Sequence, residues 1–118
     1  MAWNLDSDRP IYAQLVERIQ MQIVSGDYSC GARLPSVREL AAEAAVNPNT
    51  MQKAFAELER SGLIVTQRTN GRTVTEDEEL IGNVRRSLAR THIETFGVKM
   101  KELGYTREEI FDLLEQSI

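Results

Sequence analysis

The sequence predicts a mainly α-helical protein with one small β-hairpin. Apolar residues recur at three- and four-residue steps, the spacing of amphipathic helices, through most of the 118 residues. Residues that begin and end helices flank these segments. Asn70-Gly71 lies between two short segments rich in β-branched residues, which is the strongest local signal for a hairpin. We therefore expect one domain over residues 1–75, ending in the hairpin, and a helical tail over residues 76–118.

Two helices are expected first. One begins at Arg9-Pro10, carries an apolar stripe at helical spacing and ends at Gly26, which is typical of a core helix. The other is short and begins at Ser36, which forms the pattern of a capping box with Glu39. Small side chains at its end allow the next helix to approach closely.

The helix expected over residues 48–61 presents a polar face suited to DNA. Asn47 is a good N-cap, and Pro48 stands at the first helical position, where proline is tolerated. One face is apolar, and the face opposite, with no carboxylate before Glu57, carries Asn49, Gln52 and Lys53. Amides make bidentate contacts to adenine, and lysine contacts bases or phosphates, so this face suits the major groove. An ordinary amphipathic helix with a solvated polar face fits equally well, so the flanking segments must decide.

The hairpin that follows supplies a wing. β-branched residues lie on both sides of the Asn70-Gly71 turn. Arg68 and Arg72 flank the tip with no acid between them, so we expect both to meet phosphates or the minor groove. The two helices and this wing, residues 64–75, form a winged helix-turn-helix. Its second helix would enter the major groove, and its wing would contact the backbone or the minor groove.

The tail is expected to form a long helix followed by a short one. An acidic cluster stands at the start of the long helix, where carboxylates favour the helix dipole. Gly97 marks either a kink or a close helix contact, and Gly104 ends the helix. Thr106 and Glu109 then form a second capping box.

The apolar stripes of this tail must be covered by another surface. A second copy of the tail would give an intertwined dimer, and packing back onto the same chain is the alternative. His92 is expected as a hydrogen-bonded core or interface residue rather than as a ligand. The residues expected in this two-helix dimerisation tail are Ile81, Val84, Leu88, His92, Phe96, Met100, Leu103, Ile110, Phe111 and Leu114.

Composition excludes several classes of protein. No apolar segment is long enough to span a membrane, and the N-terminus lacks the regions of a signal peptide, so we expect a cytoplasmic protein. The single Cys30 allows neither an internal disulfide nor a multi-cysteine metal site. One histidine and no glycine-rich phosphate loop leave no nucleophile–base pair to assemble. We therefore expect no enzyme, no cofactor and no metal.

The charge distribution permits DNA binding. The net charge is −4, which argues weakly against a nucleic-acid partner, but the acidic excess lies in residues 76–118. Within residues 33–72 the basic side chains outnumber the acidic ones. This is a modest basic patch, so we expect moderate affinity that falls as salt rises.

Five segments carry a family pattern: P-I-Y-A-Q-L at 10–15, G-x-R-L-P-S-V-R-E-L-A at 31–41, V-N-P-N-T at 46–50, A-x-x-E-L-E-x-x-G-L-I at 54–64 and N-G-R-T at 70–73. On these segments the chain resembles the GntR family of bacterial transcription regulators, and within it the short YtrA-like group. The resemblance implies a homodimeric repressor on double-stranded DNA with a palindromic operator, usually near its own gene. The YtrA-like group is often linked to transporter operons.

The resemblance also implies the residues that contact DNA: Ser36, Arg38, Asn47, Asn49, Thr50, Gln52, Lys53, Arg68, Gly71 and Arg72. Cys30 departs from the family pattern, which usually has proline there, and the wing lacks the common glycine pair. The alternative function is a winged helix used only for protein contacts, but such domains typically carry acids on the recognition helix. A small-molecule effector is left open, and it could bind only at the dimer interface or between the tail and the winged helix.

Overall fold

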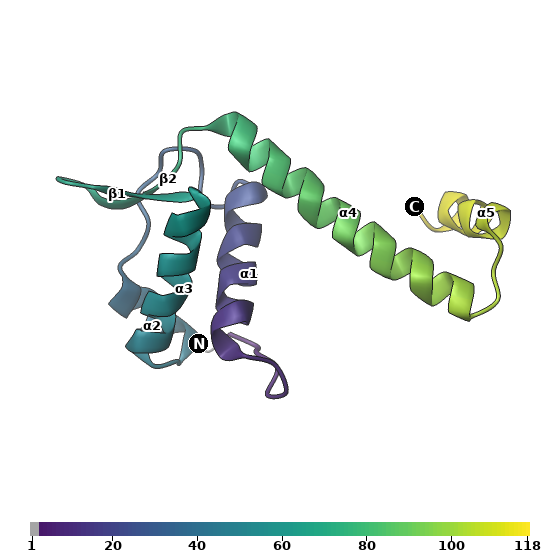
Figure 1. The fold of residues 1–118 in the computed structure, drawn as a ribbon, viewed down its shortest axis with the longest axis horizontal. Coiled ribbons are helices and arrows are strands. Elements are labelled where there is room, and N and C mark those ends of the chain that lie inside the picture. Colours follow the sequence, from purple (N-terminus) through teal and green to yellow (C-terminus); the bar gives the residue numbers. More distant parts are fainter. Residues whose placement is uncertain (1–2) are drawn as a thin grey trace. The chain divides into compact units, whose positions relative to one another are not determined.

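The computed structural model describes residues 3–118 and confirms the mainly helical fold with one hairpin. Its elements are α1 (Ile11–Val24), α2 (Val37–Ala44), α3 (Pro48–Ser61), β1 (Ile64–Gln67), β2 (Gly71–Val74), α4 (Glu78–Glu102) and α5 (Arg107–Ser117) (Figure 1). The chain divides into two compact units, Met1–Val84 and Arg85–Ile118. Within residues 3–118, no helix is both long and apolar enough to cross a membrane.

The turn between α2 and α3 is built from local hydrogen bonds and one left-handed residue. Ser36 and Glu39 cap the start of α2 reciprocally, and Ala45 ends the helix with a φ of 60°. The Asn47 side chain then accepts a hydrogen bond from the Asn49 backbone N–H at 2.8 Å, with Pro48 at the first helical position. These contacts fix the direction in which α3 leaves the turn.

One face of α3 packs into the core of the first unit. Its Met51, Phe55 and Leu58 are almost completely buried, together with Leu15 and Ile19 of α1. Figure 1 shows α1 and α3 running side by side, with the hairpin leaving the end of α3. Because these side chains fill one face of α3, its opposite face is left to solvent.

The wing is a short antiparallel hairpin anchored at its base. Ile64 pairs with Val74, and both side chains are buried in the core, whereas the tip beyond them is exposed. A bridge between Arg33 and Thr73 ties the loop before α2 to the outer edge of β2. The base of the wing is therefore fixed to the first unit, while its tip projects.

The first turns of α4 belong to the first unit. Leu80, Ile81 and Val84 are half-buried and pack against its core. Gly62 makes room for them, since a Cβ there would lie 3.2 Å from the Leu80 Cδ2 atom. Sequence periodicity placed Ile81 and Val84 with the dimerisation residues, whereas in the structure they pack against their own chain. The compact units divide within α4, between Val84 and Arg85. The functional boundary predicted after residue 75 stays a prediction.

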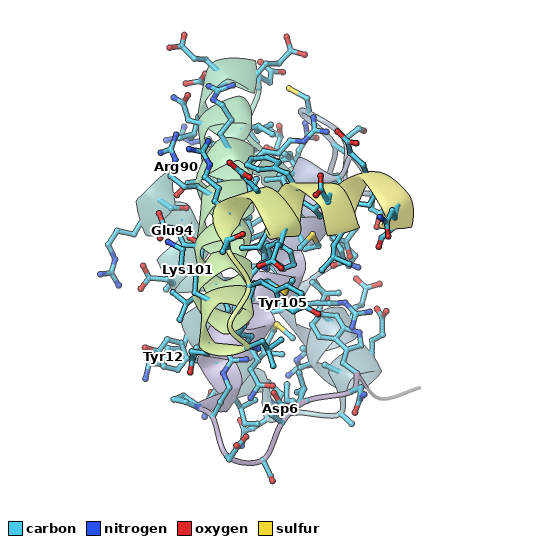
Figure 2. All side chains as sticks on the ribbon, turned by 90° about the vertical axis from the view of Figure 1, so that its right-hand side faces the viewer. Asp6, Tyr12, Arg90, Glu94, Lys101 and Tyr105 are labelled. Atoms are coloured by element: carbon cyan, nitrogen blue, oxygen red, sulfur yellow. The ribbon has the colours of Figure 1, made fainter. Side chains whose placement is uncertain are left out.

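The second unit consists of the rest of α4 and α5. α4 is helical through Gly97, so the structure shows no interruption there. Gly104, with a φ of 93°, ends the turn after α4, and Thr106 and Glu109 form the predicted capping box of α5. In Figure 2 the charged side chains of Arg90, Glu94 and Lys101 follow one edge of α4.

Candidate nucleic-acid interface

The start of α3 presents an exposed polar surface. Asn49, Gln52 and Lys53 are exposed, Thr50 is half-buried, and the first turn contains no acidic residue. Glu57, the first carboxylate of the helix, forms an ion pair with Arg60 at 3.0 Å. This surface offers amide donors and acceptors and one cation, which are the groups that read base edges and contact phosphates in the major groove.

Tyr12 positions the cation of this surface. The Lys53 ammonium lies 4.0 Å from the centre of the Tyr12 ring, close enough for a cation–π interaction. Tyr12 projects from α1 (Figure 2). With Ile11 it lines a shallow depression that Asn49 and Thr50 also border. Tyr12 could not be assigned to this surface from the sequence, because its spacing fits the apolar stripe of α1 and nothing local links it to α3.

Ser36 and Asn47 serve as helix caps. The Ser36 Oγ accepts a hydrogen bond from the Glu39 N–H at 3.1 Å, and the Glu39 carboxylate accepts one from the Ser36 N–H. Hydrogen bonding to Ser36 holds the pKa of the Glu39 carboxyl below its ordinary value. The Asn47 side chain caps α3 with one hydrogen bond, which its Oδ1 accepts from the Asn49 N–H. DNA contacts by these two residues stay predictions, and Arg38 is exposed on the same helix as the Ser36 cap.

The two wing arginines differ. Arg68 is exposed near the tip, where Gly71 adopts a φ of 70°. Arg72 is half-buried, its Nε donates to the Glu59 Oε1 at 2.9 Å, and its guanidinium lies 5.3 Å from the centre of the Phe55 ring. The sequence showed no acid between the two arginines, but the fold brings one from α3. Arg72 is therefore already paired within the protein.

A groove of about 510 Å³ runs between the start of α2 and the wing. Tyr28, Arg33, Ser36 and Arg72 are among the residues that line it. Three predicted DNA contacts, Ser36, Gly71 and Arg72, thus border one depression although they lie far apart in the sequence, whereas Arg38 and Arg68 do not line it.

The tail carries an apolar groove of about 800 Å³ between α4 and α5. Among the predicted dimerisation residues, those that line it are His92, Phe96, Ile110, Phe111 and Leu114. Leu88 and Met100 are half-buried, and Leu103 is exposed. The other five lining residues were not among the predicted dimerisation residues: Ile93, Gly97, Lys101, Arg107 and Ile118.

This geometry can be compared with known proteins. Residues 11–74 match the family model described as bacterial regulatory proteins, gntR family. The chain belongs to the GntR family. The chain is 40% identical, over 92% of its length and 90% of the relative's, to the uncharacterised HTH-type transcriptional regulator YhcF of Bacillus subtilis. Over 60% of its length it is 44% identical to 55% of the HTH-type transcriptional repressor YtrA of Bacillus subtilis.

Solved structures of GntR-type proteins agree with this assignment. A GntR family transcriptional regulator from Listeria monocytogenes is 40% identical and superposes with a TM-score of 0.88 over 95% of this chain and 98% of that one. The DNA-binding domain of AraR, solved in complex with operator ORX1, is 28% identical with a TM-score of 0.54 over 64% of this chain and 92% of that one. This GntR-family chain is a DNA-binding transcriptional regulator and not an enzyme.

The remaining alternatives are less well supported. A winged helix used only for protein contacts is not favoured, because the relatives are DNA-binding regulators and the start of α3 is free of acids. Among residues 3–118, no three side chains of His, Cys, Asp or Glu are grouped so that they could hold a metal ion. The family match over residues 11–74 spans the helix-turn-helix and the wing.

Proposed function

We propose that this GntR-family chain is a dimeric repressor that binds a palindromic operator near its own gene. α3 enters the major groove, and the wing contacts the backbone or the minor groove. The observation that carries this proposal is the exposed start of α3, where amides and one lysine stand without a carboxylate. A relative is named as a transcriptional repressor, YtrA of Bacillus subtilis, which supports the repressor role. The resemblance to the YtrA-like group favours a transporter operon as the set of regulated genes. Such a regulator acts at the bacterial chromosome, in the cytoplasm.

The proposed dimer forms through the second unit. Phe111 is 52% exposed and Ile93 is 68% exposed, beside a groove lined mainly by apolar side chains. Exposed apolar surface of this extent is a frequent mark of an interface. A second copy offers the same surface, and a twofold dimer would place two copies of α3 on two half-sites of a palindrome.

A small-molecule effector would act at this interface. The groove that would hold it is lined largely by apolar residues, with Lys101 and Arg107 among them. A ligand in the groove would change how two copies fit together, and thereby the spacing of the two recognition helices.

Selection of DNA from a randomised duplex pool, using the full-length protein, tests the proposal. The selected duplex and a shuffled duplex of the same composition are then titrated by fluorescence anisotropy at two salt concentrations, with light scattering to measure the mass of the complex. We expect a palindromic selected sequence, two chains per duplex, and much weaker binding to the shuffled duplex. Recovery of no consensus, with equal binding to both duplexes, would contradict the proposal.

A further inference from the structure

Glu59 connects the recognition helix to both strands of the wing. It lies in the last turns of α3, and its Oε1 accepts a hydrogen bond from the Arg72 Nε at 2.9 Å. Its Oε2 accepts a hydrogen bond from the Thr66 hydroxyl at 2.7 Å. Thr66 and Arg72 are directly opposed partners in the β1–β2 ladder. One carboxylate therefore holds one complete cross-strand pair.

The surroundings strengthen this contact. The side chains of Arg72 and Glu59 are 29% and 30% exposed, while those of the Arg60–Glu57 pair on the same helix are 75% and 42% exposed. The Arg72 guanidinium also covers the ring of Phe55, which is completely buried. A charged pair that is partly withdrawn from water and shares a hydrogen-bond network is less screened than a pair on the open surface. The Arg72 and Thr66 hydrogen bonds hold the pKa of Glu59 below its ordinary value, so the carboxylate is charged at neutral pH.

We propose that Glu59 is the positioning residue of the wing: it fixes the Thr66–Arg72 pair to α3, so that Arg72 acts inside the protein and Arg68 is the wing cation that contacts phosphate. The proposal rests on DNA binding by the winged helix. It changes the assignment that the sequence favours, in which both arginines contact DNA.

The direction in which DNA affinity changes when Glu59 is replaced distinguishes this positioning role from a purely electrostatic effect. Removing a carboxylate from a DNA-binding surface normally reduces repulsion and strengthens binding. Removing Glu59 should instead weaken binding, because the wing loses its fixed position on α3. Glu57 is the matched control, since it has the same charge and lies on the same helix, and its ion-pair partner is Arg60 rather than a wing residue.

The DNA-binding experiment uses full-length variants and the selected duplex over a range of salt. We expect Glu59→Ala to bind about tenfold more weakly, the equivalent of losing one charged hydrogen bond. Glu57→Ala should bind as well as the unaltered protein or better. Arg68→Gln should lower the slope of log affinity against log salt by about 0.9, the value for one phosphate contact. Arg72→Gln should weaken binding without changing that slope, and the Glu59→Ala/Arg72→Gln double variant should be no weaker than either single one.

A second measurement needs no DNA and separates the two proposals. Hydrogen exchange of the β1 and β2 amides should be faster in Glu59→Ala than in Glu57→Ala, with circular dichroism showing both variants folded. Unchanged exchange, stronger DNA binding by Glu59→Ala, or equal loss of salt slope in Arg68→Gln and Arg72→Gln would each overturn the role of Glu59. A failure of all variants and of the unaltered protein to select DNA would instead count against the proposed function.

Discussion

Two asparagines at the start of α3 should have separable functions. The Asn47 side chain is occupied as the helix cap, with 2.8 Å between its oxygen and the Asn49 nitrogen. The Asn49 side chain is exposed and, among residues 3–118, makes no hydrogen bond. Because the two asparagines lie two residues apart, substituting each in turn compares a residue that stabilises the helix with one expected to contact DNA.

Asn47→Ala should lower the free energy of unfolding by about 1 kcal/mol, the usual cost of losing an N-cap. Asn47→Ser should retain most of that stability, because serine caps well. Asn49→Ala removes no side-chain hydrogen bond or ion pair within the described residues, so the stability of this variant should stay within about 0.5 kcal/mol of the unaltered protein. Its affinity for the selected duplex should fall by about 1–3 kcal/mol, the value of one bidentate base contact, and its affinity for shuffled DNA should not change.

The free energy of unfolding is measured by urea denaturation, monitored by circular dichroism and by the fluorescence of the single tryptophan. Trp3 is 7% exposed in the core of the first unit, so its emission should change when that unit unfolds. Anisotropy titrations with the selected and the shuffled duplex measure the DNA affinity. An equal loss of affinity on both duplexes by Asn49→Ala would refute base reading. A loss of stability by Asn49→Ala as large as that of Asn47→Ala would refute the division of functions.

Three further outcomes are expected. Gly26→Ala should lower the free energy of unfolding by about 1–2 kcal/mol, because Gly26 has a left-handed backbone conformation. Gly62→Ala should lower it further, because its Cβ would also lie 3.2 Å from the Leu80 Cδ2 atom, and urea unfolding of the two variants compares these effects. Phe111→Lys, on an exposed part of the tail groove, should leave circular dichroism unchanged but convert a dimer to a monomer in light scattering, and a dimer that persists would contradict the interface. The lowered pKa of Glu59 contributes stability that is present above its unfolded value of about 4.3 and is lost as pH falls through the folded value, so the stability difference between the unaltered protein and Glu59→Ala should shrink in acid.

Local chemistry explains why much of the fold was predictable. Capping boxes at Ser36 and Thr106 and the proline at position 48 act over a few residues, and each is found where the sequence placed it. The predicted hairpin is also present, but its turn lies one residue earlier: the loop is residues 68–70, and Gly71 is the first residue of β2, paired with Gln67. Helical spacing also identified the buried face of α3, because burial of that face and exposure of the opposite one follow from the same period. The exposed amides at the start of α3 follow directly.

Contacts between elements were not predictable in this way. Arg72 meets Glu59 only because β2 returns toward α3, and Tyr12 meets Lys53 only because α1 packs beside it. Helical spacing likewise shows that Ile81 is on an apolar stripe, but it does not show which surface covers the stripe. In the structure Ile81 and Val84 are partly buried against the core of their own unit, and their place in the dimer interface stays a prediction.

The charge distribution argues that specificity comes from groups other than cations. The chain has a net charge of −4, the Arg72 guanidinium is paired with Glu59, and the Lys53 ammonium lies over Tyr12. Because the chain carries a net negative charge and Arg72 is paired within the protein, non-specific attraction to the DNA backbone should be modest. Under the proposed function, useful affinity must come from amide contacts to base edges and from engaging two half-sites at once. A regulator of this kind should discriminate strongly against random DNA, because each mismatched half-site removes contacts that general electrostatic attraction does not replace.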